Sequence, residues 1–196
     1  MTAGVRAFRG DGKNARASAD FYPTPPEAIR ALLSPQGDGD RIRHLGSVWE
    51  PACGDGAMVR EIRAAGIPVC ASDMIDRGCP DSWQADYFTC LRSRCPVVIT
   101  NPPYNLANGA GGARWVRHAV EMPGWSYLAL LLNAEWERSQ AVRKLLREHP
   151  YSYAWHLGWR IDWTGAGSPA NWHTWFVWDR DSVSEMEVRF LDKVAP

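Results

Sequence analysis

Hydrophobic residues along this chain gather in short runs that stop at turn-forming residues. The clearest run, Val97 to Ile99, is followed by Thr100, Asn101 and two prolines. A short apolar run rich in β-branched residues predicts a buried strand. The strand must end at Asn101, because proline has no backbone N–H for a sheet ladder. Similar runs predict strands at residues 47–49, 68–72 and 127–132.

Between these runs, apolar residues recur with the helical period. Helices are predicted at residues 25–33, 57–65, 114–122 and 137–149. The first has the pattern of a capping box, Thr24 followed by Glu27, with Pro25 at the first helical position. The glycine-rich stretch 105–113 is predicted to stay a loop beside the site. Strands alternating with helices indicate an α/β fold with a mostly parallel sheet.

The last fifty residues differ in composition, since they hold six of the eleven tryptophans. Residues 153–160 and 174–178 are predicted to be an antiparallel pair of strands that closes the sheet. Residues 162–172 between them are rich in Gly, Ser and Pro and predict a loop on the same side as the site. Tryptophans in strands pack first of all in the core. Trp163 and Trp172 in the loop are candidates for stacking on a nucleic-acid base.

The length of 196 residues predicts one domain with a sizeable core, residues 21–196. Residues 1–20, rich in Gly, Ala and charge, are expected to form a flexible N-terminal arm. A basic arm that contacts phosphates is the alternative. No apolar run approaches the roughly 18 residues of a membrane span, and no signal peptide is evident. A cytoplasmic protein of a bacterial, archaeal or phage-infected cell is therefore expected.

Charge and cysteine content exclude few classes of function. The five cysteines are an odd number without a C-x-x-C pair, which argues against a disulfide framework and a structural zinc site, and no metal is expected. The net charge is zero, which by itself gives no support for nucleic-acid binding. The 19 Arg against 3 Lys suit phosphate and base recognition, but a GC-rich genome produces the same bias.

Two polar motifs follow predicted strands. One is Asn101-Pro102-Pro103-Tyr104, and the other, some fifty residues upstream, is Glu50-Pro51-Ala52-Cys53-Gly54-Asp55-Gly56. In open α/β sheets, ligands bind at the carboxyl ends of the strands. In order and spacing, residues 21–136 resemble the class I S-adenosylmethionine-dependent methyltransferases that modify the N6 amine of adenine in DNA. The resemblance implies a Rossmann-like, mostly parallel seven-stranded sheet with an antiparallel C-terminal hairpin and helices on both faces.

The resemblance also implies a binding site for S-adenosylmethionine. Tyr22 and Thr24 match the element that contacts the methionine end of the cofactor. Asp73, at the end of the second strand, matches the acceptor of the ribose hydroxyls, although Asp76 is close enough to compete. Asp86 would accept from the adenine amine, and Tyr87 or Phe88 would stack on its ring. The remaining cofactor residues are those of the turn and its neighbour across the site: Glu50, Ala52, Cys53, Gly54, Gly56 and Asn101.

The catalytic residues implied are Asn101, Pro102, Pro103 and Tyr104. An exocyclic adenine amine is a poor nucleophile, because its lone pair is delocalised into the ring. The Asn101 side-chain oxygen and the Pro102 carbonyl would each accept one amine hydrogen. The prolines would stiffen the backbone that orients these acceptors. Tyr104 would stack on the base, which must leave the DNA helix to reach the pocket.

The chain departs from sequence-specific members of this family in having no target-recognition domain of a hundred or more residues. It resembles the small enzymes of phages and prophages, some linked to restriction–modification. Recognition is then expected to be relaxed, or to come from residues 105–113 and 162–172 or from a partner subunit. The sequence leaves the oligomeric state open and is compatible with a homodimer.

Rival functions share the Asn-Pro-Pro-Tyr motif. Enzymes that methylate guanine in ribosomal RNA or glutamine in release factors also carry it, but the element at Tyr22 to Pro25 favours DNA adenine. Cytosine N4 is a further possible target, although those enzymes more often have Ser or Asp in place of Asn101. A nucleic-acid-binding protein that retains the fold without turnover is the alternative outside catalysis.

Overall fold

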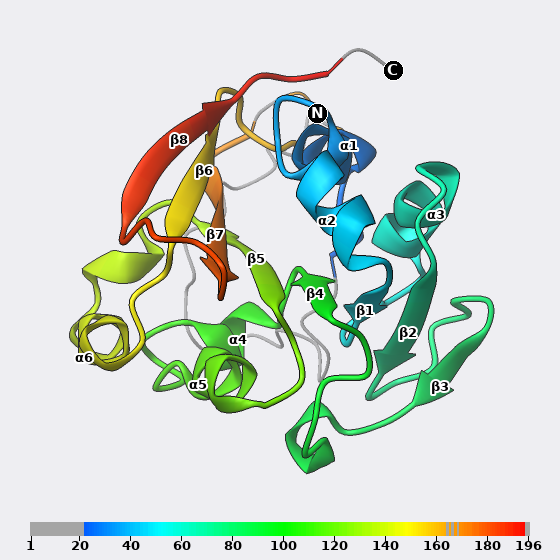
Figure 1. The fold of residues 1–196 in the computed structure, drawn as a ribbon, viewed down its shortest axis with the longest axis horizontal. Coiled ribbons are helices and arrows are strands. Elements are labelled where there is room, and N and C mark those ends of the chain that lie inside the picture. Colours follow the sequence, from blue (N-terminus) through cyan, green and yellow to red (C-terminus); the bar gives the residue numbers. More distant parts are fainter. Residues whose placement is uncertain (1–21, 164, 166, 168, 195–196) are drawn as a thin grey trace, which may run out of the picture.

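The computed structural model describes residues 22–163, 165, 167 and 169–194, so the predicted arm, residues 1–20, lies outside the described part of the chain. Within that part, the core is one eight-stranded sheet with the order β3-β2-β1-β4-β5-β7-β6-β8 (Figure 1). The strands are β1 (Val48–Glu50), β2 (Val69–Asp73), β3 (Ser82–Gln84), β4 (Val97–Thr100), β5 (Tyr127–Asn133), β6 (Tyr153–Leu157), β7 (His173–Asp179) and β8 (Glu187–Leu191).

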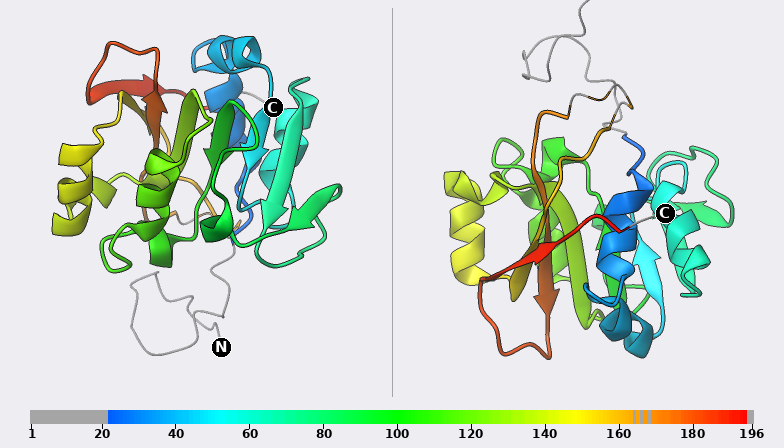
Figure 2. Two further views of the ribbon diagram at one scale, coloured as in Figure 1. Left: turned by 60° about the horizontal axis from the view of Figure 1, so that its bottom comes forward. Right: turned by 90° about the horizontal axis from the view of Figure 1, so that it is seen from above.

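Helices cover both faces of the sheet, which makes three layers (Figure 2). The helices are α1 (Pro26–Leu33), α2 (Gly39–Leu45), α3 (Ala57–Ala64), α4 (Tyr104–Ala107), α5 (Arg114–Glu121) and α6 (Gln140–Glu148), with 3₁₀ turns η1 (Tyr87–Thr89) and η2 (Trp136–Arg138). Alternate residues of β4 serve the two faces. Val97 and Ile99 pack with α1, α2 and α3, and Val98 packs with α5 and α6. No helix in the described residues is long and apolar enough to cross a membrane.

The strand directions confirm the expected fold class. β1 to β5 are mutually parallel, whereas β7 runs antiparallel to both β5 and β6. The sheet has one strand more than the seven expected, because β8 adds to β6 in parallel. Residues 187–191 were not predicted as a strand, although polar and apolar residues alternate from Glu187 to Phe190, because the segment is only five residues long.

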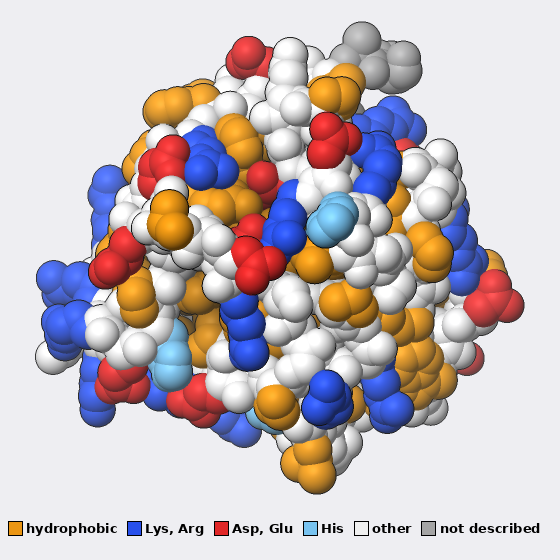
Figure 3. Space-filling model, in the orientation of Figure 1, with side chains coloured by type: hydrophobic (Ala, Val, Ile, Leu, Met, Phe, Trp, Pro, Cys, Tyr) orange, Lys and Arg blue, Asp and Glu red, His pale blue; other side chains and the backbone are white. Residues whose placement is uncertain are grey.

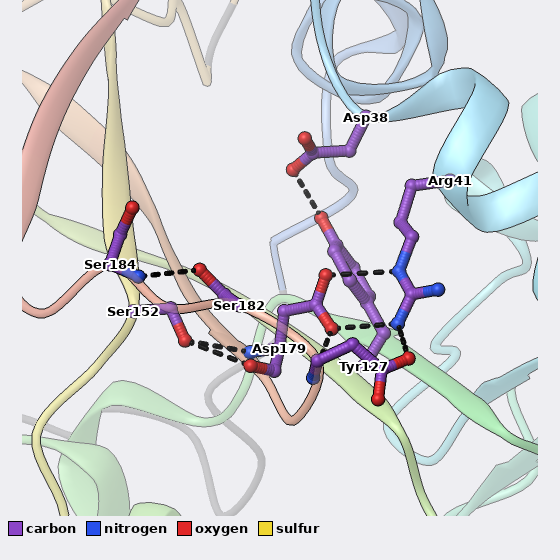
Figure 4. Close-up of polar contacts among 8 residues, drawn as sticks. Asp38, Arg41, Tyr127, Ser152, Asp179, Ser182 and Ser184 are labelled. Atoms are coloured by element: carbon purple, nitrogen blue, oxygen red, sulfur yellow. Dashed lines mark hydrogen bonds and ion pairs between the residues drawn. The ribbon is translucent and has the colours of Figure 1, made fainter.

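Helix α2 was also missed, because Pro35, Gly37 and Gly39 favour a loop at this position. Tertiary contacts hold it in place (Figure 4). The Arg41 guanidinium donates to Asp179 Oδ1 at 2.8 Å. The buried carboxylate of Asp38 accepts from the Tyr127 hydroxyl at 2.7 Å and from Trp155 Nε1 at 2.8 Å. Burial raises the pKa of Asp38 above its ordinary value.

Several predicted element boundaries were wrong. The capping box does not form, because the N-cap of α1 is Pro25 and no side chain caps the helix. The helix predicted from residue 137 is divided into η2 and α6, and Ser139 caps α6 through a bond from Val142 N–H. The first residues of the predicted loop 105–113 belong to the single turn of α4. Strand β6 ends at Leu157, directly before Gly158.

Candidate active site

The predicted site residues converge on one cavity at the carboxyl ends of β1, β2 and β4. Thirteen of the predicted residues line it: Tyr22, Thr24, Ala52, Cys53, Gly54, Asp73, Asp86, Tyr87, Phe88, Asn101, Pro102, Pro103 and Tyr104. Figure 1 shows these strand ends beside the start of α3. Two predicted residues do not line the cavity: Glu50, the last residue of β1, and Gly56, the N-cap of α3. Both are buried.

Backbone hydrogen bonds shape the turn after β1. The N–H of Gly54 donates to Asp73 Oδ2 at 2.9 Å, and the other oxygen, Oδ1, accepts from Ile75 N–H at 3.0 Å. Gly54 and Gly56 have φ of 55° and 84°, a left-handed conformation that favours glycine. At Gly56, an added Cβ would lie only 2.8 Å from Cys79 Sγ. The turn is therefore fixed by backbone geometry, and Asp73 is locked at its edge.

Asp73 and its rival Asp76 have different surroundings. Asp73 lines the cavity, whereas Asp76 is absent from its lining and accepts from Gly78 N–H at 2.9 Å. The geometry thus favours Asp73 over Asp76 as the carboxylate available to a ligand.

Glu50 is a fully buried carboxyl group beneath the turn. Its Oε1 accepts from Ala52 N–H at 3.0 Å, while Oε2 has no hydrogen-bond partner among the described residues. Loss of solvation raises the pKa of Glu50 to about 8; the nearby Thr100 hydroxyl and the Ala52 N–H only partly offset this effect. Glu50 is therefore a largely protonated acid near neutral pH and is sensitive to any charge brought to the turn.

The segment after β3 offers a carboxylate and an aromatic ring. Asp86 accepts from Phe88 N–H at 2.9 Å and so caps η1. Tyr87 is buried and stacks on Trp115, with ring centroids 4.1 Å apart. Phe88 is only partly buried, and the guanidinium of Arg114 lies 5.0 Å from its ring centroid. Of the two aromatic side chains, Phe88 is the one whose ring remains available to a ligand.

Asn101 occupies the end of β4 with its amide oriented by a second element. Its Nδ2 donates to the buried Thr24 hydroxyl at 3.1 Å. Its Oδ1 is buried and has no partner among the described residues. An unsatisfied buried acceptor is costly unless a ligand fills it. Asn101 thus lines the cavity and keeps one buried carbonyl oxygen without a partner among the described residues.

Aromatic side chains continue from Tyr104 to the loop before β7. The Tyr104 and His173 rings are nearly parallel with centroids 6.4 Å apart, and Trp163 meets His173 edge-on at 5.1 Å. Burial lowers the pKa of His173 to about 4, so the imidazole is neutral at physiological pH. Trp172 lies farther out, 47% exposed, with Arg160 over its ring at 5.0 Å. The chain places an aromatic, uncharged wall beside Tyr104.

The cavity also includes residues that the motifs did not indicate. Met74, Ile75 and Arg77 follow Asp73 directly, and Trp115 comes from α5. Met74, Ile75 and Arg77 could have been predicted from the sequence, because they follow a carboxylate at the end of a strand, where ligands bind. Trp115 had no local signal, because it reads as part of the apolar face of its helix.

No family profile and no curated protein matches this sequence. Solved structures do match the fold. A protein from Pyrococcus horikoshii described as a candidate RNA methyltransferase superposes with a TM-score of 0.61 and 15% identity, covering 80% of this chain and 84% of its own. The fold is that of the class I methyltransferases. The 23S rRNA methyltransferase ErmE gives a TM-score of 0.58 at 15% identity, over 83% of this chain and 71% of its own.

A third similar structure is the methyltransferase subunit of a type I restriction–modification system from Streptococcus thermophilus. Its TM-score is 0.56 at 16% identity, over 86% of this chain. The match covers only 46% of that subunit, so the chain spans about half of its length. Proteins with RNA-directed and restriction-system names therefore share this class I fold.

Proposed function

We propose that this protein transfers a methyl group from S-adenosylmethionine to the exocyclic N6 amine of adenine in DNA. The observation that carries the proposal is the Asn101 amide, because its nitrogen is anchored to Thr24 and its oxygen is left as a buried acceptor at the cavity. An acceptor fixed in this way suits an amine that must donate a hydrogen while its nitrogen is methylated.

The cavity residues fit the proposed cofactor. Asp73 would accept the two ribose hydroxyls, Asp86 the adenine amine, and Phe88 would stack on the adenine ring. Gly54 allows close approach of the backbone, and Tyr22 and Thr24 also line the cavity and would contact the methionine end. When bound, the sulfonium of this cofactor supplies an activated methyl group.

The chain's own residues would activate the acceptor base by orientation. Asn101 Oδ1 and the Pro102 carbonyl each accept one hydrogen of the amine, so that electron density is retained on its nitrogen. Pro102 and Pro103 restrict the backbone and so hold both acceptors in one geometry. This orientation lowers the entropic cost of bringing the amine and the methyl group into line. No strong base is needed, because methylation itself makes the amine proton acidic enough to be lost to water.

DNA adenine as the target rests on the resemblance of the element at Tyr22 to Pro25, and the aromatic surroundings support binding of a displaced base. Tyr104, His173 and Trp163 form a neutral wall that could stack on a base displaced from a duplex. The glycine-rich segment 105–113 and the loop 162–172 flank this wall and would contact the rest of the strand. Arg114 and Arg160 lie at the same two segments and could pair with phosphates.

The decisive experiment is transfer of a tritiated methyl group to duplex DNA, single-stranded DNA and RNA, followed by nucleoside analysis. We expect N6-methyladenine from DNA. N6-methyladenine mainly from RNA would support the proposed reaction but show that the substrate is RNA, as the name of the 23S rRNA methyltransferase ErmE indicates for that protein. Cofactor binding without label in any nucleic acid would contradict the proposal and favour a protein-methylating or non-catalytic role.

A further inference from the structure

The outer edge of the sheet at β8 is an open and apolar strand edge. β8 is the last strand in the sheet order, so no described strand pairs with its outer side. Val188 is 53% and Phe190 74% exposed. Soluble proteins usually protect such edges with charge, proline or a bulge, because free edges template pairing with other chains. Figure 3 shows hydrophobic side chains among charged ones on the side where β8 lies in Figure 1.

The backbone of β8 has hydrogen-bonding groups that point outward. Glu187 N–H donates to the Ser152 carbonyl at 3.2 Å, and the Leu191 carbonyl accepts from Gly158 N–H at 2.8 Å. Successive residues of a strand direct these groups to opposite sides. The N–H and C=O of Val188 and Phe190 therefore face away from β6, where a further strand would lie.

The side-chain pattern of this edge is self-complementary. Arg189 lies over the Tyr153 ring on the face of α1 and α2, at 3.7 Å from the centroid. Glu187 pairs with Arg189 and shares that face. Val188 and Phe190 alternate with these charges and lie on the opposite face. Reversed and centred on Val188, the strand places Val188 against Val188 and Glu187 against Arg189.

We propose that two copies of this chain associate through β8, as an antiparallel pair of strands centred on a two-fold axis at Val188. In this register Val188 meets Val188 of the second copy as a hydrogen-bonded pair. Glu187 of each copy lies opposite Arg189 of the other, which gives two cross-strand ion pairs. The contact is isologous, as a closed dimer requires, and joins two sheets into one.

The register distinguishes a second copy from other occupants of the edge. A different protein strand would need no two-fold match of Glu187 with Arg189. A pairing centred on so few residues is a small interface. The dimer is therefore expected to form and dissociate reversibly over the micromolar range, and mass action makes its population depend on concentration.

Sedimentation velocity over a series of concentrations tests the association. We expect the wild-type chain to shift from monomer to dimer, and Val188→Lys to stay monomeric because it sets two ammonium groups together at the axis. Leu91→Lys is the matched control, since Leu91 is 85% exposed in the segment between η1 and β4, and it should dimerise like wild type. A monomer at every concentration, or a dimer unaffected by Val188→Lys, would overturn the proposal.

Cysteine cross-linking tests the register. Val188→Cys should be joined by a short bismaleimide, because paired residues in a hydrogen-bonded position lie about 5.5 Å apart. Phe190→Cys should not, because its equivalents are four residues out of register, roughly 13 Å apart along the strands. The native cysteines are buried except for half-buried Cys70, and untreated wild type gives the background. Equal cross-linking of both variants would refute the register.

Discussion

The two halves of the sheet hold their polar groups in place by different means. At β1 and β2, backbone atoms do so: the Gly54 N–H holds Asp73, and left-handed glycines shape the turn. At β6 and β7, large side chains do so, since Trp155 Nε1 donates to buried Asp38 and Trp175 Nε1 to the Ala28 carbonyl at 3.1 Å. Substitutions that add a Cβ to glycine should therefore destabilise the first region, whereas substitutions that truncate a large side chain should destabilise the second.

The two regions meet at Asn101 and Thr24. Asn101 ends the strand between them, and Thr24 precedes α1, whose Ala28 carries the bond from Trp175. The free acceptor oxygen thus depends on the packing of α1 as well as on the local motif. Perturbing one region at a time shows how far each controls the proposed chemistry.

Asn101→Ala should have the largest effect. We expect methyl transfer to fall by at least about 10²–10³-fold, the usual cost of removing an oriented polar group at a reacting centre. Cofactor affinity, measured by calorimetry, should stay near wild type, because the free oxygen faces the acceptor. Asn133→Ala, at the end of neighbouring β5 and outside the cavity lining, is the control and should remain active. Loss of cofactor binding in Asn101→Ala would contradict the assignment.

Gly56→Ala tests the backbone-built turn. The new Cβ meets Cys79 Sγ at 2.8 Å in a left-handed conformation, so we expect a destabilisation on the order of 1–3 kcal/mol and weaker cofactor binding. Gly66→Ala, at a φ of 74°, also places alanine at positive φ but has no atom within 4 Å of the new Cβ. Denaturant unfolding of both variants separates strain from collision. If the two lose equal stability, the contact with Cys79 contributes nothing.

Glu50 gives the turn a pH dependence. Its pKa is about 8 in the fold because of burial, against an ordinary value of 4.5. The protonated form therefore contributes stability that is fully present below about pH 4.5 and is lost as the pH rises to about 8. Glu50→Gln keeps a neutral group, so unfolding free energies of the two proteins should diverge in favour of Gln across this window. A constant difference between the two curves would show that Glu50 ionises normally.

Trp163→Ala should have the smallest effect, because it tests one stacking contact of the side-chain-built region. Base–aromatic stacking contributes about 1–3 kcal/mol, so KM for DNA should rise by roughly tenfold or more while cofactor affinity is unchanged. Trp172→Ala, in the same loop but 47% exposed and stacked with Arg160, should change KM less. A larger rise in KM for Trp172→Ala than for Trp163→Ala would indicate that Trp172, rather than Trp163, stacks on the base.

The sequence by itself determined the parts of this protein whose chemistry is local. Prolines end β4 at Asn101, glycines permit the turn after β1, and strand-end carboxylates lie where parallel strands finish; each depends on neighbours in the chain. The family resemblance supplied the other site residues, and thirteen of the residues that it implies line one cavity. Tertiary structure decided the rest. Thr24 satisfies Asn101 rather than capping α1, α2 forms despite its glycines because Arg41 and Asp38 reach distant strands, and the place of β8 at the edge of the sheet depends on its pairing with β6. These outcomes depend on partners up to about 140 positions away, which no local pattern of hydrophobic and polar residues records.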